Sequence, residues 1–161
     1  MVSVHELKKI VILGYLTDGM VEKLRPLVNV LRFEEGDAIF REGDPANYFY
    51  MLKQGKILLV KRLSDSITVS LGAIQPGYSF GWSAMLEVDA YRSNALCAEP
   101  SEVYSVRGEK LKAVLDKDPA MGYLLMQRLL RVIKNRYDRR TEQFVKIITS
   151  HPDLKNLFAA E

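Results

Sequence analysis

Short β-like segments separated by turn sequences fill the middle of the chain, between residues 28 and 106. The predicted strands are 30–33, 38–40, 48–52, 57–61, 68–74, 94–98 and 103–106. The turns between them contain Gly, Asp, Pro or Ser, which are the residues that break strands and reverse the chain. Many short strands at this spacing predict an antiparallel sandwich or barrel, because closure or double-sheet packing hides the strand edges.

Helical patterns flank this β region on both sides. Before it, Thr17-Asp18 predicts the start of a helix that ends near Leu24. After it, residues 109–115 fit one short helix, and Asp118-Pro119 has the residue types preferred at the N-cap and first position of a helix. This second helix is much longer, and Pro152 marks its stop.

The long helix carries an apolar seam. Its members recur alternately every three and four residues, with one polar exception, at Tyr123, Met126, Leu130, Ile133, Tyr137, Arg140, Phe144 and Ile147. This spacing is that of a heptad repeat. Because such a helix outreaches a small barrel, we expect a homodimer through the C-terminal helix. The alternative is that the seam packs on the protein's own barrel.

Composition limits where the protein functions. The chain has 161 residues and a formal net charge of +3, which fits one domain and favours no particular partner. A single cysteine, Cys97, cannot form an intrachain disulfide, so a reducing compartment fits best. The N-terminus lacks the apolar core of a signal peptide, and no stretch approaches the roughly 18 apolar residues of a membrane span. We expect a cytoplasmic protein with no membrane contact.

Residue types also argue against catalysis. The two histidines, His5 and His151, lie at opposite ends of the chain, so no histidine cluster for a metal is predicted. The pattern G-x-S-x-G occurs once, at residues 77–81, but a nucleophilic serine there would have to recruit one of the two terminal histidines, and G-x-x-x-x-G-K-[ST] does not occur. Cys97 stands in the apolar run 95–98 and is interpreted as a small core residue. We therefore expect a protein that is not an enzyme.

The turns and their aromatic neighbours together resemble one family. Their order and approximate spacing are those of the cyclic nucleotide-binding domain family, which includes bacterial catabolite activator proteins and regulatory subunits of cAMP-dependent kinase. The matching segments are Glu35-Gly36-Asp37, Ile39-Phe40, Glu42-Gly43-Asp44, Ala46, Phe49-Tyr50, Gly55, Gly72, Pro76-Gly77 and Phe80-Gly81. Most of these residues have a structural interpretation, since glycines supply the positive φ angles of turns.

The resemblance runs from about residue 15 to about residue 144 and implies a mainly β fold with flanking helices. It implies an antiparallel β-roll, or jelly roll, with short N-terminal helices and one long C-terminal helix. We expect a single domain over residues 1–161. Its parts are N-terminal helices at 1–27, the β-roll at 28–107, C-terminal helices at 108–149 and a tail at 150–161.

The family's ligand site is a phosphate-binding cassette, which the resemblance places at residues 80–95. Gly81 lets the backbone approach an anion, and Ser83 with Ala84 would present amides at the start of a short helix. Arg92 follows eleven residues after Gly81 and is the expected phosphate contact, assisted by the hydroxyls of Ser83 and Ser93. The alternative for Arg92 is a surface ion pair with Glu87 or Asp89.

One position departs from the family pattern. Members that bind cyclic nucleotide have a glutamate after Phe-Gly, which accepts a hydrogen bond from the ribose 2′-hydroxyl, whereas this chain has Trp82. An indole offers one donor and no acceptor, and leaving the hydroxyl unpaired costs about 1–3 kcal/mol. Two hypotheses follow: the pocket takes a different small anion that stacks on Trp82, or Trp82 fills it and the domain works without a ligand.

The resemblance also implies an output route. In the family the long helix caps the ligand's base and forms the dimer seam, so Tyr137 either stacks on a ring or belongs to the seam. Family transcription regulators continue into a helix-turn-helix, whereas here only residues 150–161 follow, so we expect no direct DNA binding. We therefore predict a regulatory domain that senses a cyclic nucleotide or another phosphate or carboxylate. It would signal through its dimer or a separate effector protein. The rival hypothesis is a ligand-independent dimerisation or scaffold module, and an enzyme ranks third.

Overall fold

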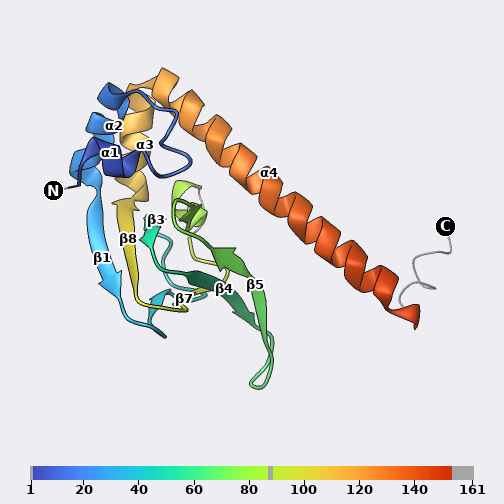
Figure 1. Cartoon of the computed structure of the whole chain (residues 1–161). Coiled ribbons are helices and arrows are strands. Elements are labelled where there is room, and N and C mark those ends of the chain that lie inside the picture. The colour runs from blue at the N-terminus through green and yellow to red at the C-terminus, as the bar shows by residue number, and fades with distance from the viewer. Residues whose placement is uncertain (1, 87–88, 154–161) are drawn as a thin grey trace. The chain divides into compact units, whose positions relative to one another are not determined.

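The computed structural model describes residues 2–86 and 89–153, and its strands form two antiparallel sheets of four strands each (Figure 1). The first sheet has the order β1-β8-β3-β6 and the second the order β2-β7-β4-β5. In chain order the strands are β1 (Asn29–Phe33), β2 (Ala38–Phe40), β3 (Tyr48–Gln54), β4 (Ile57–Arg62), β5 (Thr68–Ile74), β6 (Ser79–Phe80), β7 (Asn94–Cys97) and β8 (Ser101–Arg107).

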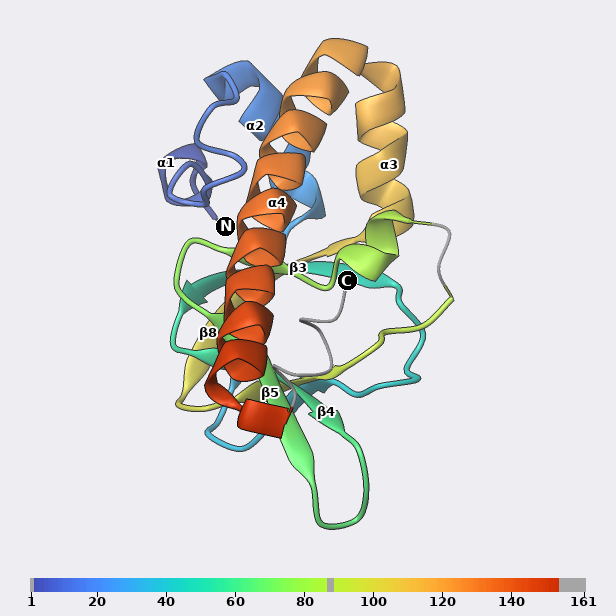
Figure 2. The same cartoon turned by 90° about the vertical axis from the view of Figure 1, so that its right-hand side faces the viewer.

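The seven predicted strands and the β-roll are confirmed, and the structure adds β6. This strand has only two residues, so it is too short to show the alternation by which strands are recognised in sequence. Its pairing is nevertheless definite, with Tyr50 opposite Phe80 and Met51 opposite Ser79. Figure 2 shows the β4–β5 hairpin projecting from the roll.

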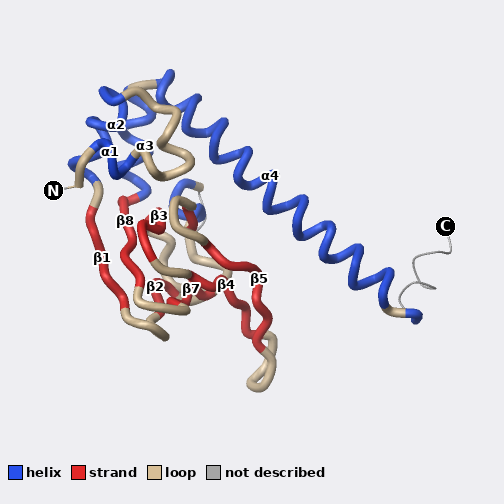
Figure 3. Tube along the Cα trace, in the orientation of Figure 1, coloured by secondary structure: helices blue, strands red, loops and turns tan. Residues whose placement is uncertain are grey.

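Short helices from before and after the strands gather at one end of the roll (Figure 3). They are α1 (Val4–Leu7), α2 (Asp18–Leu24), η1 (Arg25–Leu27), and α3 (Gly108–Lys117), while η2 (Trp82–Met85) lies within the predicted cassette. The predicted start of α2 is confirmed, because the Thr17 hydroxyl accepts a hydrogen bond from the Met20 N–H at 3.3 Å.

The helix α4 (Pro119–Ser150) also begins as predicted. The Asp118 carboxylate accepts a hydrogen bond from the Met121 N–H at 3.1 Å and pairs with Lys23 at 2.7 Å. Both contacts stabilise the charged carboxylate, so the pKa of Asp118 lies below its usual value, the Lys23 hydrogen bond being the larger cause.

Strand β3 is buried on both faces, because it lies between the interior of the roll and a layer of helices. Its inward side chains, Tyr50 and Leu52, belong to the interior of the roll together with Phe40, Ile57, Ile74, Phe80, Tyr91, Ala95, Cys97 and Val103. Its outward side chains, Phe49 and Met51, meet apolar side chains of the helical layer, which are Ile12, Leu13, Leu24, Leu111 and Leu125. Alternation along the strand therefore separates a roll interior from an outer, helix-covered face.

The described chain divides after Leu125 into two units, the second of which holds most of α4. The side chains of the predicted seam are exposed; for example, Leu130 and Tyr137 each expose 67% of their surface. No helix in the part of the chain that the structure describes is both long and apolar enough to cross a membrane. Most of the predicted tail, residues 154–161, lies outside the described residues.

Candidate functional site

The predicted cassette starts with a sharp turn at Gly81, between β6 and η2. Gly81 adopts the left-handed conformation, with φ at 71°, which favours glycine. An added Cβ would also lie 2.9 Å from Cδ2 of Tyr50 and 3.1 Å from the carbonyl oxygen of Tyr48. Backbone conformation and close packing therefore both require glycine here.

The other side of η2 rests on the first residue of α3. A Cβ added at Gly108 would collide with the carbonyl group of Ala84, and the Gly108 N–H donates a hydrogen bond to the Asn47 carbonyl at 2.9 Å. Gly108 thus fixes the depth at which the cassette helix sits. The sequence analysis missed this role, although a glycine at a strand-to-helix junction is a signal of close backbone approach.

The amides at the start of η2 are not equivalent. The Ala84 N–H donates to the Gly81 carbonyl at 3.2 Å, so it is already used within the turn. The Ser83 N–H has no acceptor among the residues that the structure describes, and Ser83 itself is half-buried. Of the two predicted amides, Ser83 is the one left to meet an anion.

The Trp82 indole is held by a neighbour in β6. Its Nε1–H donates to the hydroxyl of Ser79 at 3.2 Å, and Ser79 is buried. Ser79 pairs with Met51, whose side chain lies on the outer face of the sheet, whereas the adjacent Phe80 points into the roll. The Trp82 N–H is therefore directed toward the outer face. The indole gives position 82 no hydrogen-bond acceptor.

The far end of the cassette is bound to the loop between β2 and β3. The Tyr91 N–H donates to the Asp44 carbonyl, the Gly43 N–H donates to the Tyr91 carbonyl, and the Ala46 N–H donates to the Asp89 carbonyl, each at 3.0 Å. These three bonds set the two segments side by side in antiparallel fashion. The backbone that leads into Arg92 is therefore fixed independently of any ligand.

The side chain of Tyr91 adds a second anchor. Its ring stacks on Phe40 with centroids 3.8 Å apart. Its hydroxyl donates to the Tyr48 carbonyl at 2.6 Å and accepts from the Tyr48 N–H at 3.1 Å. Burial raises the pKa of Tyr91, so the hydroxyl stays protonated at neutral pH and keeps both roles.

Arg92 follows directly, with an exposed side chain. Its carbonyl accepts a hydrogen bond from Lys61 Nζ at 3.5 Å, and Lys61 also pairs with Glu42 at 2.8 Å. The Glu42 N–H donates to the Asn94 side-chain oxygen at 2.9 Å. These contacts hold the backbone around Arg92 and do not involve its guanidinium.

The Arg92 guanidinium makes no ion pair with any described residue, so Asp89 is not its partner. The other predicted partner, Glu87, lies outside the described residues. Ser93 is half-buried next to Arg92, whereas Ala84 belongs to η2 and Gly81 to the turn before it. Tyr137 belongs to α4 in the other unit.

In the described ranges no group of three or more His, Cys, Asp or Glu side chains is placed to hold a metal ion.

Comparison with known proteins agrees with this geometry. The family model of the cyclic nucleotide-binding domain matches residues 30–118, which is more than half of the chain. A solved structure described as a cyclic nucleotide-binding protein from Geobacter metallireducens GS-15 is 26% identical, with a TM-score of 0.74 over 85% of this chain and 99% of that one. A cyclic nucleotide-binding domain from Methylobacillus flagellatus KT has a TM-score of 0.77 at 17% identity, over 89% of this chain and 80% of that one.

Among curated proteins, the cAMP-dependent protein kinase regulatory subunit of Dictyostelium discoideum is 23% identical over 143 residues, covering 76% of this chain and 44% of that protein. This chain thus spans less than half the length of the curated relatives it matches.

Proposed function

The chain belongs to the cyclic nucleotide-binding domain family, and on that premise we propose that it is a non-enzymatic regulatory domain that senses a small anionic ligand at the cassette. The proposal rests on the state of the Arg92 side chain. Its guanidinium is exposed and unpaired among the described residues, on a backbone that Tyr91 and Lys61 hold in place. A guanidinium offers planar, bidentate contacts to phosphate or carboxylate oxygens.

Trp82 limits the classes of ligand that the cassette can bind. In the family the corresponding glutamate accepts a hydrogen bond from the ribose, and the indole cannot replace it. Because the indole N–H of Trp82 already donates to Ser79, the side chain has no polar group left for a sugar hydroxyl. We propose a phosphate or carboxylate ligand whose binding does not depend on a ribose 2′-hydroxyl, and cyclic nucleotides are the first compounds to test.

Thermal unfolding in the presence of cyclic AMP, cyclic GMP, 2′-deoxy cyclic AMP and inorganic phosphate tests this proposal. A ligand at 100 times its dissociation constant adds about 2.7 kcal/mol to the free energy of unfolding. Arg92→Ala should abolish the shift in melting temperature and leave the melting temperature without ligand unchanged. Lys110→Ala removes the same charge from an exposed position on α3 and should keep the shift. A shift that survives Arg92→Ala would overturn the proposed role of the cassette.

The second candidate function is a dimerisation or scaffold module that needs no ligand. It is supported by the missing acceptor at Trp82 and by the exposed seam of α4. Under this hypothesis no compound in the panel shifts the melting temperature, and Arg92→Ala leaves partner binding unchanged.

We also propose that α4 joins two copies in a parallel homodimer, the route by which occupancy of the cassette leaves the domain. The support is the exposure of seam side chains, with Ile133 at its centre exposing 37% of its surface. A charge buried unpaired in such a seam costs several kcal/mol. Ile133→Glu should therefore yield a monomer in sedimentation, with the roll still folded. Asn135→Glu adds the same charge at an exposed position off the seam and should leave the dimer intact. A wild-type monomer at micromolar concentration would contradict this proposal.

A further inference from the structure

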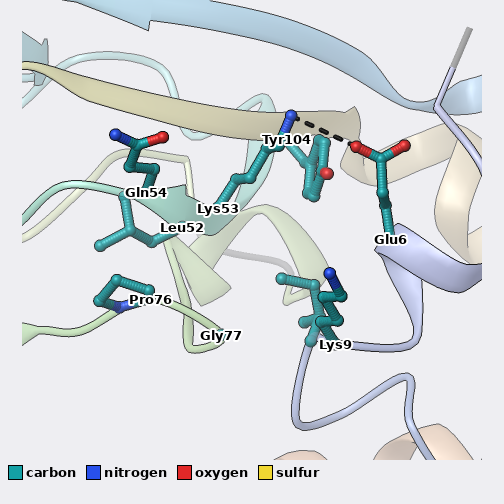
Figure 4. Close-up of a pocket in the computed structure, with 9 residues that line it drawn as sticks. Glu6, Lys9, Leu52, Lys53, Gln54, Pro76, Gly77 and Tyr104 are labelled. Atoms are coloured by element: carbon teal, nitrogen blue, oxygen red, sulfur yellow. Dashed lines mark ion pairs between the residues drawn. The ribbon is translucent and has the colours of Figure 1, made fainter.

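A cavity lined by none of the cassette residues lies on the outer face of the sheet that contains β3 and β8 (Figure 4). It has a volume of about 380 Å³. Its walls come from α1 and the segment after it, from β3 and β8, and from the turn before β6. The lining residues are Glu6, Lys9, Ile10, Leu52, Lys53, Gln54, Pro76, Gly77 and Tyr104.

Two of the charged groups at this cavity are already engaged. The Glu6 carboxylate accepts hydrogen bonds from the N–H and hydroxyl of Ser3, both at 3.0 Å, and lies 3.4 Å from Lys53 Nζ (Figure 4). Lys53 also pairs with Glu102 at 3.3 Å. This chain of contacts ties α1 to the sheet and pairs the acidic lining group with a cation and two hydrogen-bond donors.

Three side chains of the lining have donors without a described partner: Tyr104, Lys9 and the exposed amide of Gln54. Tyr104 exposes 1% of its surface, and its hydroxyl has no hydrogen-bond partner among the described residues. Burial raises the pKa of Tyr104, which keeps the hydroxyl protonated. Lys9 is exposed at the rim, and its ammonium makes no ion pair with any residue in the described ranges. A buried hydroxyl without a partner is rare in folded proteins and calls for an explanation.

Apart from the amide of Gln54, the rest of the lining is largely apolar. Ile10 is buried at the cavity and Pro76 forms part of its edge, while Leu52 borders it from β3 with a side chain that belongs to the roll interior. Concave sites for small molecules combine such apolar walls with a few polar groups that fix orientation. An ammonium and a hydroxyl, both donors, beside an apolar floor suit a compound with a carboxylate at one end and a short apolar body at the other.

We infer that this cavity is a second ligand site, which binds a small organic carboxylate through Lys9 and Tyr104. The site uses none of the cassette residues, and it lies on the outer face of β3, opposite the roll interior. The inference therefore stands or falls independently of the proposed function.

Titration of the isotopically labelled protein with benzoate, followed by NMR, tests the inference. Benzoate should produce saturable shifts of the amide signals of Lys9, Lys53 and Gly77, and benzamide, its neutral counterpart, should bind at least about tenfold more weakly. Lys9→Gln and Tyr104→Phe should each weaken benzoate binding about tenfold, since each removes one charged or charge-assisted contact.

Three controls keep the test decisive. Lys110→Gln removes the same charge as Lys9→Gln from α3 and should leave the benzoate affinity unchanged, as should Arg92→Ala in the cassette. Tyr104→Phe removes a hydroxyl without a described partner, so its melting temperature should equal or exceed that of the wild type. The inference is overturned if benzoate gives no saturable shift at the lining residues, if benzamide binds equally well, or if Arg92→Ala abolishes binding.

Discussion

The two ends of the cassette are held by different physical means. The beginning, at Gly81 and η2, is held by close packing, because Tyr50 and Gly108 approach the backbone where a side chain would not fit. The far end, at Tyr91 and Arg92, is held by hydrogen bonds from the loop between β2 and β3 and from Tyr48. Both ends are thus fixed by residues that are not expected to contact a ligand.

The residues that hold the backbone of the cassette are therefore different from the residues expected to contact a ligand. The groups expected to read a ligand are Ser83, Arg92 and the side chain at position 82. The Trp82 indole donates a hydrogen bond to Ser79, outside the contacts that hold the two ends. A change at position 82 can therefore alter selectivity while the fold of the domain stays the same.

The packed end should be the more sensitive to substitution. Gly108→Ala forces a methyl group against the carbonyl of Ala84, and neither backbone can move freely. We expect the free energy of unfolding in urea to fall by about 3 kcal/mol. Gly19→Ala is the matched control, because nothing lies within 4 Å of an added Cβ in α2, where alanine is favoured over glycine. Equal stabilities of the two variants would contradict the packing account.

The hydrogen-bonded end should respond less. Tyr91→Phe keeps the ring on Phe40 but leaves the N–H and carbonyl of Tyr48 without the hydroxyl that pairs with both. We expect a loss of about 2 kcal/mol in the free energy of unfolding, measured by urea titration. Tyr48→Phe removes a hydroxyl from a partly exposed ring and should change stability by less than about 0.5 kcal/mol. A loss no larger in Tyr91→Phe than in Tyr48→Phe would show that packing alone holds this end.

The sequence predicts much of this frame because its signals are local. Turn glycines, alternating strands and the caps at Thr17 and Asp118 act within a few residues, and the structure confirms each. The family resemblance implies the β-roll and the position of the cassette, which no short-range pattern contains.

The remainder depends on contacts between distant segments. The close approach of Gly108 to Ala84, the hydrogen bonds of Tyr91 to Tyr48 and the cavity beneath α1 join residues far apart in the chain. The orientation of Trp82 depends on which face of β6 carries Ser79, and a two-residue strand gives no periodicity from which to read it. Side-chain direction at the cassette was therefore beyond sequence reasoning.

The central claim is that the cassette is intact and that position 82 alone disables recognition of the ribose. Calorimetry with cyclic AMP and 2′-deoxy cyclic AMP, on the wild type and on Trp82→Glu, tests it most directly. The wild type should bind the two compounds equally or not at all, whereas Trp82→Glu should gain about tenfold in affinity for cyclic AMP and prefer it over the 2′-deoxy compound by a similar factor. Trp82→Phe, which adds no acceptor, should not gain this preference. A wild type that already prefers cyclic AMP over 2′-deoxy cyclic AMP tenfold, or binds it as tightly as Trp82→Glu, would contradict the claim.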